Sequence, residues 1–75
     1  MTADREIPRL RTERSGCWHL AVKAEGGEFV AWGRPGRDIG QSPLEAMLRF
    51  RDVMTAWGWS EEAALAKLKR KVKGG

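Results

Sequence analysis

Two alternating runs of residues joined by a Gly-Gly pair constrain the fold of this chain more than any other feature. The first run, Cys17 to Ala24, has the two-residue period of a β-strand. The second run, Phe29 to Trp32, follows Gly26-Gly27, a pair that tolerates the positive φ angles of a tight hairpin turn. We therefore predict an antiparallel hairpin between residues 17 and 32.

The predicted hairpin has two unlike faces, because residues that lie opposite each other on paired strands share a face. In this register Ala24 lies opposite Phe29. The apolar face consists of Trp18, Leu20, Val22, Ala24, Phe29 and Ala31. The mixed face consists of His19, Ala21, Lys23, Val30 and Trp32.

The remaining segments belong to the same single domain, residues 1–75. Residues 1–6 are polar and are expected to form a mobile arm. Residues 7–14 are expected to add an edge strand, a position that suits Pro8, so strands and hairpin occupy 7–32. A loop rich in glycine and proline follows at 33–41, and two helices are predicted at 42–57 and 60–73.

Capping residues mark the start of both predicted helices. Ser42 is an N-cap followed by Pro43 and by Glu45 at the capping-box position, and Ser60 caps the second helix. The apolar stripe of the 42–57 helix, which is expected to cover the apolar hairpin face, is Ala46, Met47, Phe50, Val53, Met54 and Trp57.

The predicted fold class is therefore α+β. A two- or three-stranded antiparallel sheet packs on one amphipathic helix, and a second, basic C-terminal helix follows.

The four tryptophans of the chain are expected to have different roles. Trp18 and Trp57 are predicted to be core residues, one from the sheet and one from the first helix. Trp59 is predicted to be a packing wedge at the turn between the helices. Trp32 falls on the mixed face, so it is either covered by the chain itself or kept for a partner.

Leu44 and Leu48 lie off the apolar stripe of the first predicted helix and form a second, smaller apolar patch. Either the second helix folds back onto this patch, or the patch is a surface for a partner or for self-association. The short turn between the helices favours the first interpretation, because short turns favour antiparallel packing of neighbouring helices.

Composition and motif content exclude several classes of protein. Cys17 is the only cysteine, so no intramolecular disulfide can form, and a cytoplasmic location is expected. No apolar run has the length of a membrane span or the character of a signal peptide. His19 has no ligand partner at metal spacing, and residues 33–37 lack a nucleotide-loop pattern. We predict no enzymatic activity, no metal and no cofactor.

Basic side chains interleaved with an aromatic one indicate nucleic-acid binding. A surface that stacks on bases or reads a groove needs an aromatic ring together with cations that contact the phosphate backbone of the nucleic acid. The mixed face offers both. The net charge of +4 comes mainly from the second predicted helix, whose cations either contact phosphates or form a solvated face that suits the helix dipole. The candidate binding residues are Arg9, Arg11, His19, Lys23, Trp32, Arg34, Arg37, Lys67, Arg70 and Lys71.

Three stretches resemble small sheet-plus-helix modules of phages, namely Trp18-His19-Leu20-Ala21-Val22, Phe29-Val30-Ala31-Trp32 and the Ser42-x-x-Glu45-Ala46 helix start. One such module is the arm-type DNA-binding domain of phage integrases, which presents a three-stranded sheet to the DNA groove. Another is the group of tiny phage-encoded inhibitors that includes anti-CRISPR proteins. These stretches are fold signals, and no family is assigned from them.

The sequence thus favours a small, basic, non-enzymatic nucleic-acid-binding module or accessory regulator, with DNA favoured over RNA as the partner. The alternative is a small protein-binding regulator or inhibitor that occludes a partner surface, with an acidic protein surface as its target. Trp32 or the Leu44/Leu48 patch would then be the anchor of the interface. No membrane partner is expected, and a monomer and a weak dimer are both compatible with the sequence.

Overall fold

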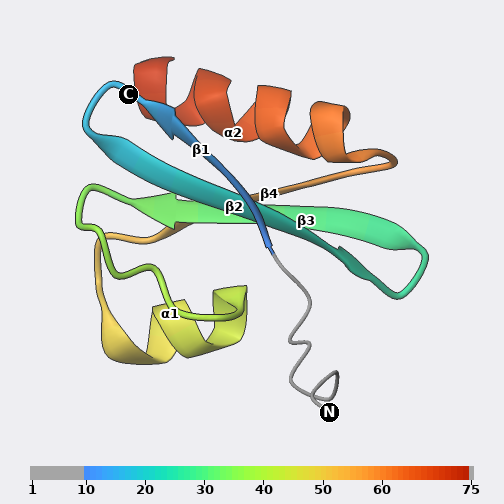
Figure 1. Cartoon of the computed structure of the whole chain (residues 1–75). Coiled ribbons are helices and arrows are strands. Elements are labelled where there is room, and N and C mark those ends of the chain that lie inside the picture. The colour runs from blue at the N-terminus through green and yellow to red at the C-terminus, as the bar shows by residue number, and fades with distance from the viewer. Residues whose placement is uncertain (1–9, 75) are drawn as a thin grey trace, which may run out of the picture.

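The predicted hairpin forms the centre of a four-stranded antiparallel sheet (Figure 1). The computed structural model describes residues 10–74. Its elements in chain order are β1 (Arg11–Ser15), β2 (Trp18–Glu25), β3 (Glu28–Arg34), α1 (Pro43–Arg49), β4 (Met54–Gly58) and α2 (Glu61–Gly74). The strands lie in the sheet in sequence order. The α+β class is confirmed, but the sheet has more strands than the two or three predicted.

The register of the β2–β3 hairpin is the predicted one, with Ala24 as the partner of Phe29. Gly26 and Gly27 have φ angles of 55° and 88°, in the left-handed region that glycine adopts without strain. The outer strand β1 pairs with β2 from Arg11 to Ser15. The expected edge strand is therefore present in its second half, whereas residues 1–9 lie outside the described residues.

The helix predicted at 42–57 is wrong in its second half. Ser42 caps α1 as predicted, since its hydroxyl accepts a hydrogen bond from the N–H of Glu45 at 3.1 Å. However, α1 ends at Arg49, and Phe50 has the extended angles φ −131° and ψ 156°. Residues 54–58 form β4, which pairs antiparallel with β3.

Strand pairing explains why the helical stripe is interrupted. Thr55 and Trp57 are β-branched and aromatic residues that favour a strand, and β4 provides hydrogen-bonding partners for the main chain along one side of β3. The chain reversal before β4 is held by Arg34 of β3. Its Nε donates to Asp52 Oδ1 at 2.8 Å, and its guanidinium lies 3.9 Å from the centre of the Phe50 ring.

The second helix, and not the first, covers the apolar face of the sheet, so the predicted packing is also wrong. Figure 1 shows α2 on one side of the sheet and α1 on the other. Ala64, Leu65 and Leu68 of α2 pack against the buried sheet residues Leu20, Val22, Ala31 and Ala56. The approach is so close that a Cβ at Gly58 would lie 2.6 Å from the backbone nitrogen of Ala64. A glycine is therefore required where β4 passes beneath α2.

Trp32 is covered by the chain itself, so of its two expected roles it has that of a core residue and is not kept for a partner. Its side chain is 0% exposed and belongs to a second core with Ala21, Ile39 and Ala46. The indole Nε1 donates to the carbonyl oxygen of Ile39 at 2.8 Å. The loop after β3 and the helix α1 thus form a layer over part of the mixed face.

The other tryptophans agree only partly with prediction. Trp18 packs, half-buried, against the apolar core beneath α2. Trp57 is 45% exposed and Trp59 is 78% exposed, so the core role of Trp57 and the wedge role of Trp59 are wrong. Because Trp57 is a strand residue opposite Val30, it shares the mixed face and is not part of a helical stripe.

We predict that Trp32→Phe destabilises the protein by about 2 kcal/mol, because it leaves the buried Ile39 carbonyl without its donor and removes ring atoms from the core. The measurement is the free energy of unfolding from chemical denaturation. The matched control is Trp59→Phe at an exposed position, which should change stability by no more than about 0.5 kcal/mol. Equal losses in the two variants would contradict the central role assigned to Trp32.

Candidate functional site

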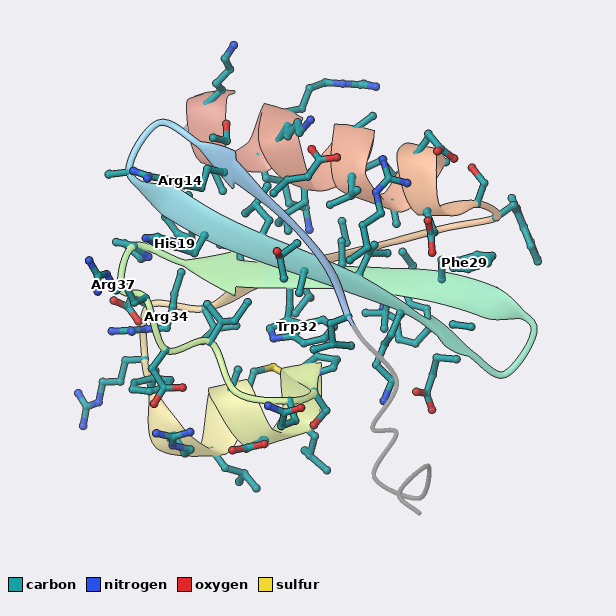
Figure 2. The ribbon with its side chains drawn as sticks, viewed as in Figure 1. Arg14, His19, Phe29, Trp32, Arg34 and Arg37 are labelled. Atoms are coloured by element: carbon teal, nitrogen blue, oxygen red, sulfur yellow. The ribbon has the colours of Figure 1, made fainter. Side chains whose placement is uncertain are left out.

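A row of basic residues crosses three strands at one end of the sheet. The strand register makes His19 the partner of Arg14 on β1 and of Arg34 on β3, so all three lie on one face. Figure 2 shows these residues and Arg37 gathered at the same end, with Phe29 at the opposite end. Arg37 belongs to the loop that follows β3.

A surface hollow of about 350 Å³ lies beside this row. It is lined by Thr12, Glu13, Arg14, His19, Leu20, Arg37 and Ile39. Within residues 10–74, neither Arg14 nor Arg37 forms an ion pair. Two guanidinium groups with free charge therefore border one hollow.

Arg34 differs from these two arginines because its charge is already engaged. Its side chain is only 18% exposed and is paired with Asp52 through both nitrogen–oxygen contacts, at 2.8 and 3.3 Å. Its Nη1 also donates to the carbonyl oxygen of Asp38 at 3.1 Å. This guanidinium lowers the pKa of Asp52 through a charge-assisted hydrogen bond. Arg34 therefore holds the loop in place and contributes little free charge.

Ion pairs leave a surplus of positive charge in the described part of the chain. The acidic residues there are all ion-paired except Glu28. The basic residues outside any ion pair among residues 10–74 are Arg14, Arg37, Arg51, Lys67, Arg70, Lys71 and Lys73. The surplus is therefore carried by side chains that an anionic partner can engage without breaking an ion pair.

The helix α2 brings more of this charge to the same end of the molecule. Arg11 binds Glu61 and Glu62 at the start of α2, at 2.9 and 3.0 Å, and Lys69 Nζ binds Glu13 at 2.6 Å further along β1. The helix therefore runs along β1 towards the β1–β2 turn, and Figure 1 shows its C-terminal end above that turn. We call Arg14, His19, Arg34, Arg37, Arg70 and Lys73 the basic end.

The structure brings together some predicted site residues and separates others. His19, Arg34 and Arg37 lie side by side, and Arg70 is exposed on the last turns of α2. Trp32 is buried, so the expectation that it contacts a partner is corrected. Lys23 lies towards the other end of β2, 3.7 Å from Glu25.

The remaining candidates have other environments. Arg11 binds three carboxylates, those of Glu13, Glu61 and Glu62, so its charge is already neutralised. Lys67 is exposed on α2, and Lys71 Nζ donates to the carbonyl oxygen of Thr55 at 2.6 Å. Arg9 lies outside the described residues. Arg14 is the residue that sequence reasoning missed, and only the β1–β2 register could have placed it beside His19.

A second hollow, of about 420 Å³, lies on the part of the mixed face that α1 leaves open. It is lined by Lys23, Glu25, Val30, Ser42, Pro43, Leu44, Met47, Thr55 and Trp57, and we call it the apolar groove. Leu44 is 64% exposed, Met47 52% and the neighbouring Leu48 78%. The expectation that the second helix folds back onto Leu44 and Leu48 is wrong, because α2 occupies the opposite face of the sheet.

Comparisons with protein-family models, with curated proteins and with solved structures gave no match for this chain. Within residues 10–74, neither helix has the length and apolarity needed to cross a membrane. The same residues contain no group of three or more histidine, cysteine, aspartate or glutamate side chains that could hold a metal ion. The assignment of a function therefore depends on the two surfaces described above.

Acidic residues in the ion pairs make stability dependent on pH. The hydrogen bond from Lys69 lowers the pKa of Glu13, and Arg49 and Arg34 do the same for Asp38 and Asp52. A carboxylate whose pKa is lowered by folding stabilises the protein fully above its usual pKa, which is 4.5 for Glu13. The stabilisation is lost as the pH falls through the lowered value.

We predict that the melting temperature falls between about pH 5 and pH 2, and that Glu13→Gln reduces this fall because the variant has no charge to lose there. Thermal unfolding followed by circular dichroism over this range is the measurement. Glu28→Gln is the control, because Glu28 has no ion-pair partner within residues 10–74. A Glu13→Gln profile parallel to that of the parent protein would contradict the assignment.

Proposed function

We propose that this protein is a non-enzymatic module that binds the phosphate backbone of nucleic acid through its basic end. The observation that supports the proposal is the register that aligns Arg14, His19 and Arg34 across three strands, with Arg37 beside them. Arginine is suited to this task because its planar guanidinium donates paired hydrogen bonds to phosphate oxygens.

The electrostatics of the basic end support an anionic partner. Arg14 and Arg37 line the same hollow, and two like charges near each other repel, so their closeness costs free energy in the isolated protein. A bound phosphate would relieve this repulsion and would replace water at the hollow between the two side chains. The cations of α2 would add contacts with further phosphates, each of them dependent on salt concentration.

We expect the double variant Arg14→Ala, Arg37→Ala to bind nucleic acid more weakly than the parent protein at low salt. Loss of two phosphate contacts should make the slope of log K against log salt concentration shallower by about 1.8 for a duplex. Fluorescence anisotropy with a labelled duplex and a labelled single strand, each at several salt concentrations, measures both quantities.

The matched control for this experiment is Lys23→Ala, which removes a positive charge from the same sheet face at the other end of β2. It should leave the salt slope nearly unchanged. Absence of binding to either nucleic acid at low salt would overturn the proposed function. The single variants Arg14→Ala and Arg37→Ala are measured as well. If Lys23→Ala weakens binding as much as each of them does, only net charge matters, and the assignment of the site is overturned.

A second candidate function, a protein-binding regulator or inhibitor, is favoured by the apolar groove. Leu44, Met47 and Trp57 are exposed apolar side chains that line it, and Leu48 is exposed on the same helix as Leu44. Exposed clusters of this kind are typical of protein interfaces, where a few aromatic and aliphatic anchors supply most of the binding energy. An apolar side chain of a partner would fill the groove, with Lys23 and Glu25 at its rim.

We expect Met47→Asp to abolish binding of a partner that this groove recruits, because it places a charge on the wall of the groove. The measurement is affinity purification from nuclease-treated extract with three baits: the parent protein, Met47→Asp, and Arg14→Ala with Arg37→Ala. Retention of a partner by the first and third baits alone would support the second function. A partner retained equally by all three would contradict it.

A further inference from the structure

Aromatic and basic surfaces lie at opposite ends of this protein. Among the described residues, the exposed aromatic side chains are Trp57 and Trp59. Trp57 lies opposite Val30, and Gly58 lies opposite Phe29, next to the β2–β3 turn. The basic end lies at the other end of the same strands, around the β1–β2 turn. Bases stacked on the tryptophans would therefore have their phosphates far from the free arginines.

The aromatic rings nearer the basic end are already in use. Phe50 lies under two guanidinium groups, those of Arg34 at 3.9 Å and of Arg49 at 4.8 Å from its ring centre. Trp18, at the start of β2, packs against the core beneath α2. Trp32 is buried beneath the loop and α1. Within residues 10–74, the basic end thus offers charge without an exposed ring on which an unpaired base could stack.

Single-stranded nucleic acid is bound most effectively where cations and aromatic rings alternate along one groove. A duplex requires no stacking, and it presents two phosphates for each step of the helix where a single strand presents one. A surface that supplies cations alone therefore gains more from a duplex. We propose, building on the proposed function, that the basic end binds double-stranded nucleic acid in preference to single strands.

The β1–β2 turn is the element that would lie against the duplex. Its residues Gly16 and Cys17 are exposed and uncharged, and a Cβ at Gly16 would meet no other atom within 4 Å. Arg14 and Arg37 lie on one side of this turn (Figure 2), and the C-terminal end of α2, whose exposed residues include Arg70 and Lys73, lies on the other (Figure 1). A duplex also has two backbones on either side of a groove. The two groups of basic residues, one on each side of an uncharged turn, match the two phosphate backbones on either side of a groove.

The first experiment compares affinities for a duplex of about 20 base pairs and for each of its single strands, with DNA and RNA duplexes as separate arms. We expect the DNA duplex to bind about tenfold more tightly than either strand at low salt. If Arg14, Arg37, Arg70 and Lys73 each neutralise one phosphate, the salt slope is about −3.6 for duplex DNA and about −2.8 for a single strand. Tighter binding of the RNA duplex would assign the preference to A-form helices.

The second experiment tests the position of the duplex with a pair of variants that each add one negative charge. Cys17→Glu places it at the β1–β2 turn, and Ala24→Glu places it at an exposed position near the far end of β2. We expect Cys17→Glu to weaken duplex binding about fivefold, and Ala24→Glu to have little effect. Circular dichroism of both variants verifies that the fold is retained.

The possible outcomes separate this inference from the proposed function. Equal or tighter binding of single strands, still weakened by Arg14→Ala with Arg37→Ala, would overturn the duplex preference and leave the proposed function standing. Equal weakening by Cys17→Glu and Ala24→Glu would overturn the placement of the turn against the duplex. Absence of binding to any nucleic acid would overturn both proposals.

Discussion

The buried hydrogen bond from Trp32 to Ile39 is the contact on which the arrangement of the mixed face depends. A large indole in the middle of a sheet would otherwise expose most of its area, and its N–H would require water. By donating to the carbonyl oxygen of Ile39, the indole binds the loop after β3 to the sheet. The loop in turn positions Arg37 beside His19 and leads the chain into α1. The position of Arg37 in the basic end and the α1 wall of the apolar groove both follow from this contact.

Covered faces restrict where this protein can act. One face of the sheet lies beneath α2, and part of the other lies beneath the loop and α1. What is left for a partner is the basic end, the open groove and the outer surface of α2. The basic end and the apolar groove differ in chemistry, and the two hollows share no lining residue.

Local signals predicted the parts of the fold that depend on neighbouring residues, and failed where distant segments meet. The Gly26-Gly27 turn fixed the hairpin register, and Ser42 and Ser60 cap the helices as their sequences predict. The stripe from Ala46 to Trp57 fits a helix equally well, and only pairing of β4 with β3 makes its second half a strand. His19 and Arg37 were found as candidates from sequence. Their neighbour Arg14 was not, because β1 contains no residue that fixes its register.

The bond from Lys71 to the Thr55 carbonyl has a consequence for association between copies of the chain. Strand β4 is the last strand of the described sheet and has no charged residue between Met54 and Gly58. Such an edge is a template for pairing with a second molecule, which leads to aggregation at high concentration. The ammonium group of Lys71 occupies one of its main-chain acceptors and brings a charge that a second copy of the strand would have to desolvate. The helix α2 thereby discourages pairing of this edge with a second copy of the chain.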